Sequence, residues 1–237
     1  MAGLLYAKQC PINENISVCI PSVGEVLDNE DEFFEMVSTV VATPYDMMVA
    51  LDDVGINFTK INDFDLFMLM FGNLQHRDTS LLFGDLCFDN FAPAINKETN
   101  EMVLVDIEKD IVIDRTIHHE IATVIRRILS LERNDKKAGN DEARKYMIER
   151  ARVKQKRKAK KTDKYKSQIE DIIVSLVNAE EFPYNYQTVR DITIYQLYSS
   201  LNQISHTIHF DNTMIGYYAG TVKIEDLKPE DRTWLRT

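Results

Sequence analysis

The chain has 237 residues and a formal net charge of -10 at pH 7, and its 44% apolar content is enough to bury an ordinary core, which excludes a disordered chain. Its 8 glycines and 6 prolines are too few for the turns of an all-β sandwich, so we expect helices to dominate. No apolar run approaches the roughly 20 residues that span a bilayer, so we expect no membrane contact.

The cysteines indicate the compartment. Cys10, Cys19 and Cys87 are odd in number and lack the spacing of a zinc site, so we expect neither a disulfide framework nor a bound metal. The first residues also lack the basic segment and long apolar run of a signal peptide. These features predict a protein of the cytosol.

The N-terminal part predicts one short strand followed by several helices. Residues 16–20 are typical of a strand, and Ser22 and Glu25 have the spacing of a capping box that begins a helix. Asn62 can cap a core helix that ends before Gly72. The helices predicted after the first one cover residues 32–41, 43–55 and 62–71.

A small sheet and a strongly amphipathic helix are predicted next. Short apolar runs separated by Asn and Asp residues indicate strands at 81–83, 102–105 and 111–113. Asp114 can cap the following helix, in which apolar residues recur at steps of three and four as far as Leu131.

The pair His118-His119, followed by Glu120, is the most enzyme-like feature of the chain. A zinc-binding helix needs two histidines four residues apart, but Ala122 and Thr123 stand at the required positions. We therefore expect an exposed polar helix face there and no metal. No acid-base pair, calcium loop or phosphate loop is recognisable either, so we predict no catalytic residue, no cofactor and no enzymatic activity.

A strongly basic segment stands out within this acidic chain. Residues 144–166 hold twelve Lys and Arg against two acidic residues, so the segment carries +10 and the rest of the chain -20. The run 150–161 lacks aromatic residues that could stack on bases, so it would contact only phosphates of a nucleic acid. An acidic partner surface, a solvated helix and complementarity with the rest of this chain are the alternatives.

The C-terminal part contains the most regular apolar spacing. Ile194, Leu197, Leu201, Ile204 and Ile208 follow steps of three and four and predict a helix that packs in a bundle or against a partner. We expect this helix to end at Asp211-Asn212. His206 and His209 would then lie near its C-terminus, where they suit the negative end of the helix dipole.

Together these elements predict an α+β, predominantly helical fold, a helical bundle with a small β-sheet or hairpin. We predict an N-terminal helical domain with short strands at 1–133, a basic helical connector at 134–168 and a C-terminal helical segment with a glycine- and aromatic-containing tail at 169–237. The predicted partner-binding residues are Lys154, Lys156, Arg157, Lys158, Lys160, Lys161, Ile194, Leu197, Leu201, Ile204 and Ile208.

Several segments resemble a group of tailed-bacteriophage proteins encoded in the tail-assembly region. The similarity covers nearly the full length, and its motifs are structural and not catalytic. The segments that carry it are 20–26, 43–47, 51–56, 64–67, 80–86, 113–115, 192–196 and 214–221, with Trp234 after them.

The resemblance implies a tail assembly chaperone, a non-enzymatic protein that keeps the tape-measure protein soluble while the tail tube polymerises. Such a chaperone would act in the cytoplasm of the infected host. Its partners would be phage tail proteins, most simply the tape-measure protein, or further copies of itself. Met47, Met48, Met68 and Met70 could form the groove for a client helix. The alternatives are a neck or tail adaptor retained in the virion and a nucleic-acid-backbone binder that acts through residues 154–161.

Overall fold

The computed structural model describes residues 3–134, 136–159 and 166–236, and it divides the chain into two compact units. Unit 1 comprises Met1–Pro21 and Asn29–Lys166, and unit 2 comprises Ser22–Asp28 and Ser167–Thr237. The three-part division predicted from the sequence stays a prediction.

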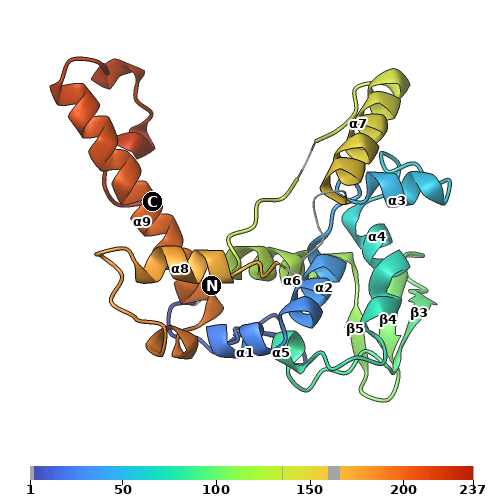
Figure 1. The fold of residues 1–237 in the computed structure, drawn as a ribbon. Helices are drawn as coiled ribbons and strands as arrows, with labels where there is room; N and C mark the ends of the chain where they lie inside the picture. Colours follow the sequence, from blue (N-terminus) through green and yellow to red (C-terminus); the bar gives the residue numbers. More distant parts are fainter. Residues whose placement is uncertain (1–2, 135, 160–165, 237) are drawn as a thin grey trace. The chain divides into compact units, whose positions relative to one another are not determined.

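Unit 1 combines short helices with two small antiparallel sheets (Figure 1). The strands are β1 (Gln9–Pro11) and β2 (Ser17–Cys19), which pair with each other, and β3 (Phe91–Ile95), β4 (Met102–Asp106) and β5 (Ile111–Ile113), which form a sheet in that order. The helices are α2 (Glu30–Val41), α3 (Met48–Asp53), α4 (Asp63–Met70), the 3-10 helix η1 (Phe71–Leu74), α5 (Ser80–Phe83), α6 (Arg115–Ile128) and α7 (Asp141–Ala159).

The core of unit 1 lies where α2 packs against α4 and α6. The apolar faces predicted for the helices in this core are buried, with Phe33 and Val40 of α2 each 1% exposed. Asp114 caps α6 as predicted, and its side chain accepts a hydrogen bond from the Ile117 amide at 2.8 Å. The prediction of a predominantly helical α+β fold with a small sheet is confirmed.

Three local predictions in unit 1 were wrong. The run 81–83 belongs to helix α5 and not to a strand; just before it, the Asp78 side chain accepts a hydrogen bond from the Ser80 amide at 2.9 Å. An apolar run this short cannot distinguish strand from helix. The helix expected from residue 43 begins only at Met48, although Thr43 and Asp46 do exchange capping hydrogen bonds.

The third wrong prediction is the glycine stop after α4. Asn62 caps the N-terminus of α4 as predicted, in a capping box with Asp65. At the other end, Gly72 does not adopt a positive φ and lies inside η1, so the chain continues from α4 into a 3-10 turn. Strand β3 was not predicted, since Pro93 in its centre argues against a strand.

Unit 2 is built around one long helix. Its elements are α1 (Val23–Asp28), α8 (Glu170–Val177), the 3-10 helix η2 (Thr188–Asp191), α9 (Ile194–Tyr218) and the 3-10 helices η3 (Ile224–Asp226) and η4 (Pro229–Arg232). The predicted capping box of α1 forms, with the Glu25 amide donating to Ser22 at 3.2 Å and the Ser22 amide donating to Glu25 at 2.7 Å. Ser22 also forms a β-bridge with Thr193, which ties α1 to the start of α9.

Helix α9 extends further than the sequence suggested. Asp211 and Asn212 do not end it, and it continues to Tyr218. It stops where Gly220 adopts a φ of 75°, a left-handed conformation that glycine accepts without strain. None of the helices in the described part of the chain combines the length and hydropathy that a membrane span requires.

Candidate functional site

The apolar stripe of α9 runs from the core of unit 2 into solvent. We call it the α9 seam. Its apolar members are Ile194, Leu197, Leu201, Ile204, Ile208, Ile215 and Tyr218, and Asp211 occupies the position between Ile208 and Ile215. Ile194 and Leu197 are fully buried, whereas Ile208 is 51% and Ile215 67% exposed. Of the predicted partner-binding residues in α9, only those after Leu197 are therefore accessible.

The C-terminal segment returns beside α9 (Figure 1). Gln203 donates to the Trp234 carbonyl at 2.8 Å, and Nε2 of His206 lies 2.8 Å from the Thr233 carbonyl. Successive residues of an α-helix are rotated by about 100°, so these two side chains project well away from the seam. The segment therefore leaves the outer seam uncovered.

The two histidines of α9 do not lie at its end, as the sequence had suggested. Because α9 continues to Tyr218, His206 and His209 lie in the middle of the helix. His206 contacts Thr233, and Nε2 of His209 lies 3.4 Å from a carboxylate oxygen of Asp231. Their role is to hold the C-terminal segment and not to face the helix dipole.

Helix α7, which carries part of the basic segment, docks on α3 within unit 1. Ile148 is 5% exposed and packs in an apolar cluster with Met48 and Leu51. Arg152 donates to Asp52 at 2.9 Å and to Asp53 at 2.5 Å, and the hydrogen bonds to Asp53 and Asp52 raise the pKa of Arg152. Part of the basic charge thus faces acidic side chains of the same chain.

Beyond Arg152, the described side chains of α7 are exposed. Lys154, Lys156 and Arg157 are exposed and have no ion-pair partner within the described residues. Lys158 falls in the last turn of α7, and its side chain is not described; Lys160 and Lys161 lie outside the described residues. The predicted basic and apolar partner-binding groups therefore belong to different compact units.

The methionines proposed for a client groove are packed inside unit 1. Met48 is 7% exposed, and Met47 and Met70 pack against the cluster that contains it. Met68 is half-buried. These side chains fill a core, so they do not form an open groove.

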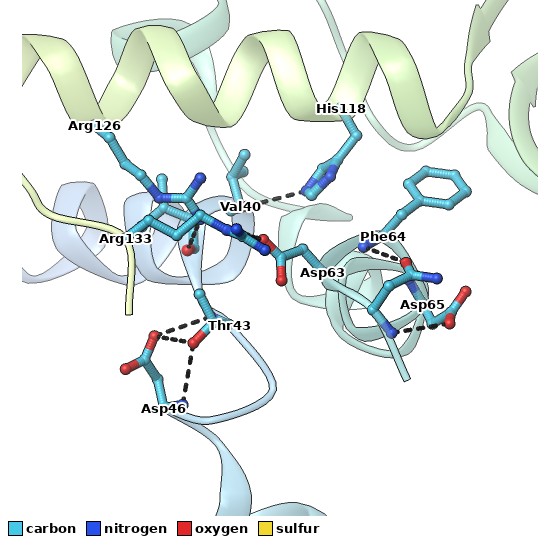
Figure 2. Close-up of polar contacts among 11 residues, drawn as sticks. Val40, Thr43, Asp46, Asp63, Phe64, Asp65, His118, Arg126 and Arg133 are labelled. Carbon is cyan, nitrogen blue, oxygen red and sulfur yellow. Dashed lines mark hydrogen bonds and ion pairs between the residues drawn. The ribbon is translucent and has the colours of Figure 1, made fainter. Parts of the chain in front are cut away.

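A buried polar network lies between α2, α4 and α6 (Figure 2), and the sequence did not predict it. His118 is 2% exposed, and its Nε2 donates to the Val40 carbonyl at 3.0 Å. Its ring stacks on Phe67 with centroids 4.5 Å apart. Burial lowers the pKa of His118 to about 4, so the imidazole is neutral at pH 7. The expectation that His118 lies on an exposed face was wrong.

Arg126 extends the network along α6. Its Nη2 donates to the Val41 carbonyl at 2.5 Å and lies 3.8 Å from Asp63, which also accepts a hydrogen bond from Arg133 at 2.9 Å. Figure 2 shows His118 and Arg126 pointing from α6 toward the end of α2. The two side chains thus satisfy carbonyl groups that the C-terminus of a helix leaves unpaired.

Two clefts of about 480 and 340 Å³ adjoin this network and share Asn62, Asp63 and Arg133. His118 lines the smaller cleft, but its Nε2 proton is committed to the Val40 carbonyl. Among the described residues, no group of three or more His, Cys, Asp or Glu side chains could hold a metal ion. The network is best explained as support for the fold.

The family model of the YomV second domain, a phage-derived family, matches residues 157–237. The matched residues include α8, α9 and the returning C-terminal segment, and the match fits a phage protein. No curated protein and no solved structure matches the chain.

Proposed function

We propose that the chain is a non-enzymatic phage morphogenesis protein, a chaperone that binds the tape-measure protein during tail assembly. In this proposal, the outer part of the α9 seam receives an apolar helix of the client. The client has to be kept soluble until tail tube subunits surround it, because its apolar helices are exposed before assembly.

The observation that carries this proposal is the change in burial along one apolar stripe. The seam keeps its spacing beyond the core of unit 2, yet Ile208 and Ile215 are 51% and 67% exposed. An apolar stripe with helical spacing is the form in which many proteins receive a partner helix. The stripe also lies in the region that matches the phage-derived family.

The proposal is tested by recovering the protein from infected cells and from purified virions and identifying its partners by mass spectrometry. We expect the tape-measure protein to co-purify from cells and the chaperone to be absent from virions. The double variant Ile208→Ser/Ile215→Ser should recover about tenfold less tape-measure protein, because it removes the apolar contacts.

The matched control is the double variant Ile95→Ser/Ile107→Ser in unit 1, whose isoleucines are 64% and 84% exposed. It removes two isoleucines that lie away from the seam and are, taken together, more exposed than Ile208 and Ile215, so capture should remain. Equal loss in both variants would reject the α9 seam as the binding surface. Recovery of the protein from virions at a ring-like copy number would instead support a neck or tail adaptor.

A second candidate function rests on the exposed cations at the end of α7. Lys154, Lys156 and Arg157 could contact nucleic acid phosphates, and such binding weakens steeply as salt rises. The test is a salt titration of binding to a DNA duplex. Neutralising Lys156, Arg157, Lys158, Lys160 and Lys161 together should abolish binding. Affinity that is unaffected by salt or by this variant would reject this function.

A further inference from the structure

Helix α9 is almost free of charge. In a chain of which 28% is charged, residues 194–218 contain no Lys, Arg or Glu and only one Asp, Asp211. The residues that flank the seam carry no charge. They are Tyr198, Ser200, Ser205, Thr207, Asn212 and Met214. Charged residues at flanking positions commonly select the partner of a coiled coil, and α9 has no charged residue at these positions.

Asp211 occupies a seam position and not a flanking one. The seam steps from Ile208 to Asp211 and then to Ile215, so the carboxylate interrupts an apolar row. Asp211 is exposed and has no hydrogen-bond or ion-pair partner within the described residues. A single polar residue in such a seam fixes the register and the choice of partner, because an apolar partner would leave it unpaired.

We infer that the outer seam receives one apolar helix of a partner protein that places a single Lys or Arg opposite Asp211. The uncharged flanks allow the two helices to approach, the isoleucines supply the apolar contact, and the ion pair sets the register. This inference rests on the proposed function, because it names the kind of client segment that the same surface takes.

A second copy of the chain fits the seam less well. Helix α9 has no Lys or Arg that could meet Asp211 of the other copy. A parallel pair in register would also place two Asp211 carboxylates against each other, and like charges across an interface oppose association. The charge pattern therefore favours a different protein as the occupant.

The inference is tested with the full chain and two fluorescent helical peptides. Both peptides have Leu at the seam positions and Ala, Ser and Gln elsewhere, and they differ only in a central seam residue, Lys or Glu. By fluorescence anisotropy, we expect the Lys peptide to bind about tenfold more tightly than the Glu peptide, because charge complementarity across an interface sets specificity.

Variants of the single charge give the control. Asp211→Lys should reverse the preference between the peptides, and Asp211→Asn should remove it, while circular dichroism shows unchanged helix content because Asp211 is exposed. Binding of neither peptide, or equal binding of both to the native chain, would overturn the inference. A dimer in sedimentation velocity that is lost in Ile208→Ser/Ile215→Ser would also overturn it.

The peptide test and the capture test fail separately. A native chain that discriminates the peptides but recovers no tape-measure protein from infected cells would reject the proposed function. The outer α9 seam would remain a helix-binding surface selected by Asp211. A chain that recovers the tape-measure protein but binds both peptides equally would keep the function and reject the role of Asp211.

Discussion

Helices α6 and α9 both carry apolar residues at steps of three and four, but their surroundings differ. In α6 the stripe is covered from Ile121 to Ile128, which are 3% and 2% exposed. In α9 the stripe is buried only at its start, and Ile215 is 67% exposed. The spacing of apolar residues in the sequence therefore identifies an apolar helix face, but it does not show whether that face is covered.

The largest expected effect comes from shortening a side chain in the covered stripe. Ile125 of α6 is fully buried, so Ile125→Ala should lower the free energy of unfolding by about 3 kcal/mol. The same change at Ile215, Ile215→Ala, should cost less than about 0.5 kcal/mol, because little area is lost. Urea unfolding of both variants measures the contrast. Similar losses would mean that the two stripes are equally covered.

The next effect is the pH dependence that His118 gives to the covered region. Its pKa is about 4 in the folded protein, below its ordinary value of 6.5, so the unfolded chain binds more protons between these values. Stability should therefore be complete above pH 6.5 and fall by up to about 3 kcal/mol as the pH drops to 4. Urea unfolding at several pH values measures this loss.

The neighbouring histidine supplies the control for this prediction. His119 is exposed, so His119→Gln should keep the pH dependence of the native chain. His118→Gln should be less stable at pH 7, because it loses the packing on Phe67, and it should lack the steep loss between pH 6.5 and 4. An unchanged slope in His118→Gln would assign the pH dependence to other groups.

A smaller effect is expected at the start of α9, where its stripe is still buried. Thr193 caps the helix by accepting a hydrogen bond from the Gln196 amide at 3.2 Å, while Gln196 accepts one from the Thr193 amide at 2.9 Å. Thr193→Ala should lower the free energy of unfolding by about 1 kcal/mol. Thr193→Ser keeps the hydroxyl and should recover most of the loss. No recovery would mean that the methyl group, and not the cap, matters there.

Sequence patterns predicted those features of the fold that depend on near neighbours. The caps at Ser22, Asn62 and Asp114 were predicted because a capping side chain bonds to amides two or three residues away. The position of His118 depends on α2 and α4, which are distant in sequence. One signal was available: His118 lies three residues before Ile121 and therefore on its helix face.

The candidate site was predictable only in part, for a similar reason. Leu201, Ile204 and Ile208 were identified by their spacing, but the burial of Ile194 and Leu197 depends on the elements that pack around the start of α9. The sequence also placed the end of α9 too early, which hid Ile215 from the stripe. Asp and Asn are only weak helix breakers, whereas Gly220 ends the helix.

The central claim is that the outer α9 seam contacts the client, and site-specific photo-crosslinking in infected cells tests it most directly. A photoreactive residue at Ile208 should crosslink to the tape-measure protein, whereas the same residue at Ile107, which is 84% exposed in unit 1, should not. Crosslinks to the tape-measure protein from Ile107 and none from Ile208 would contradict the account.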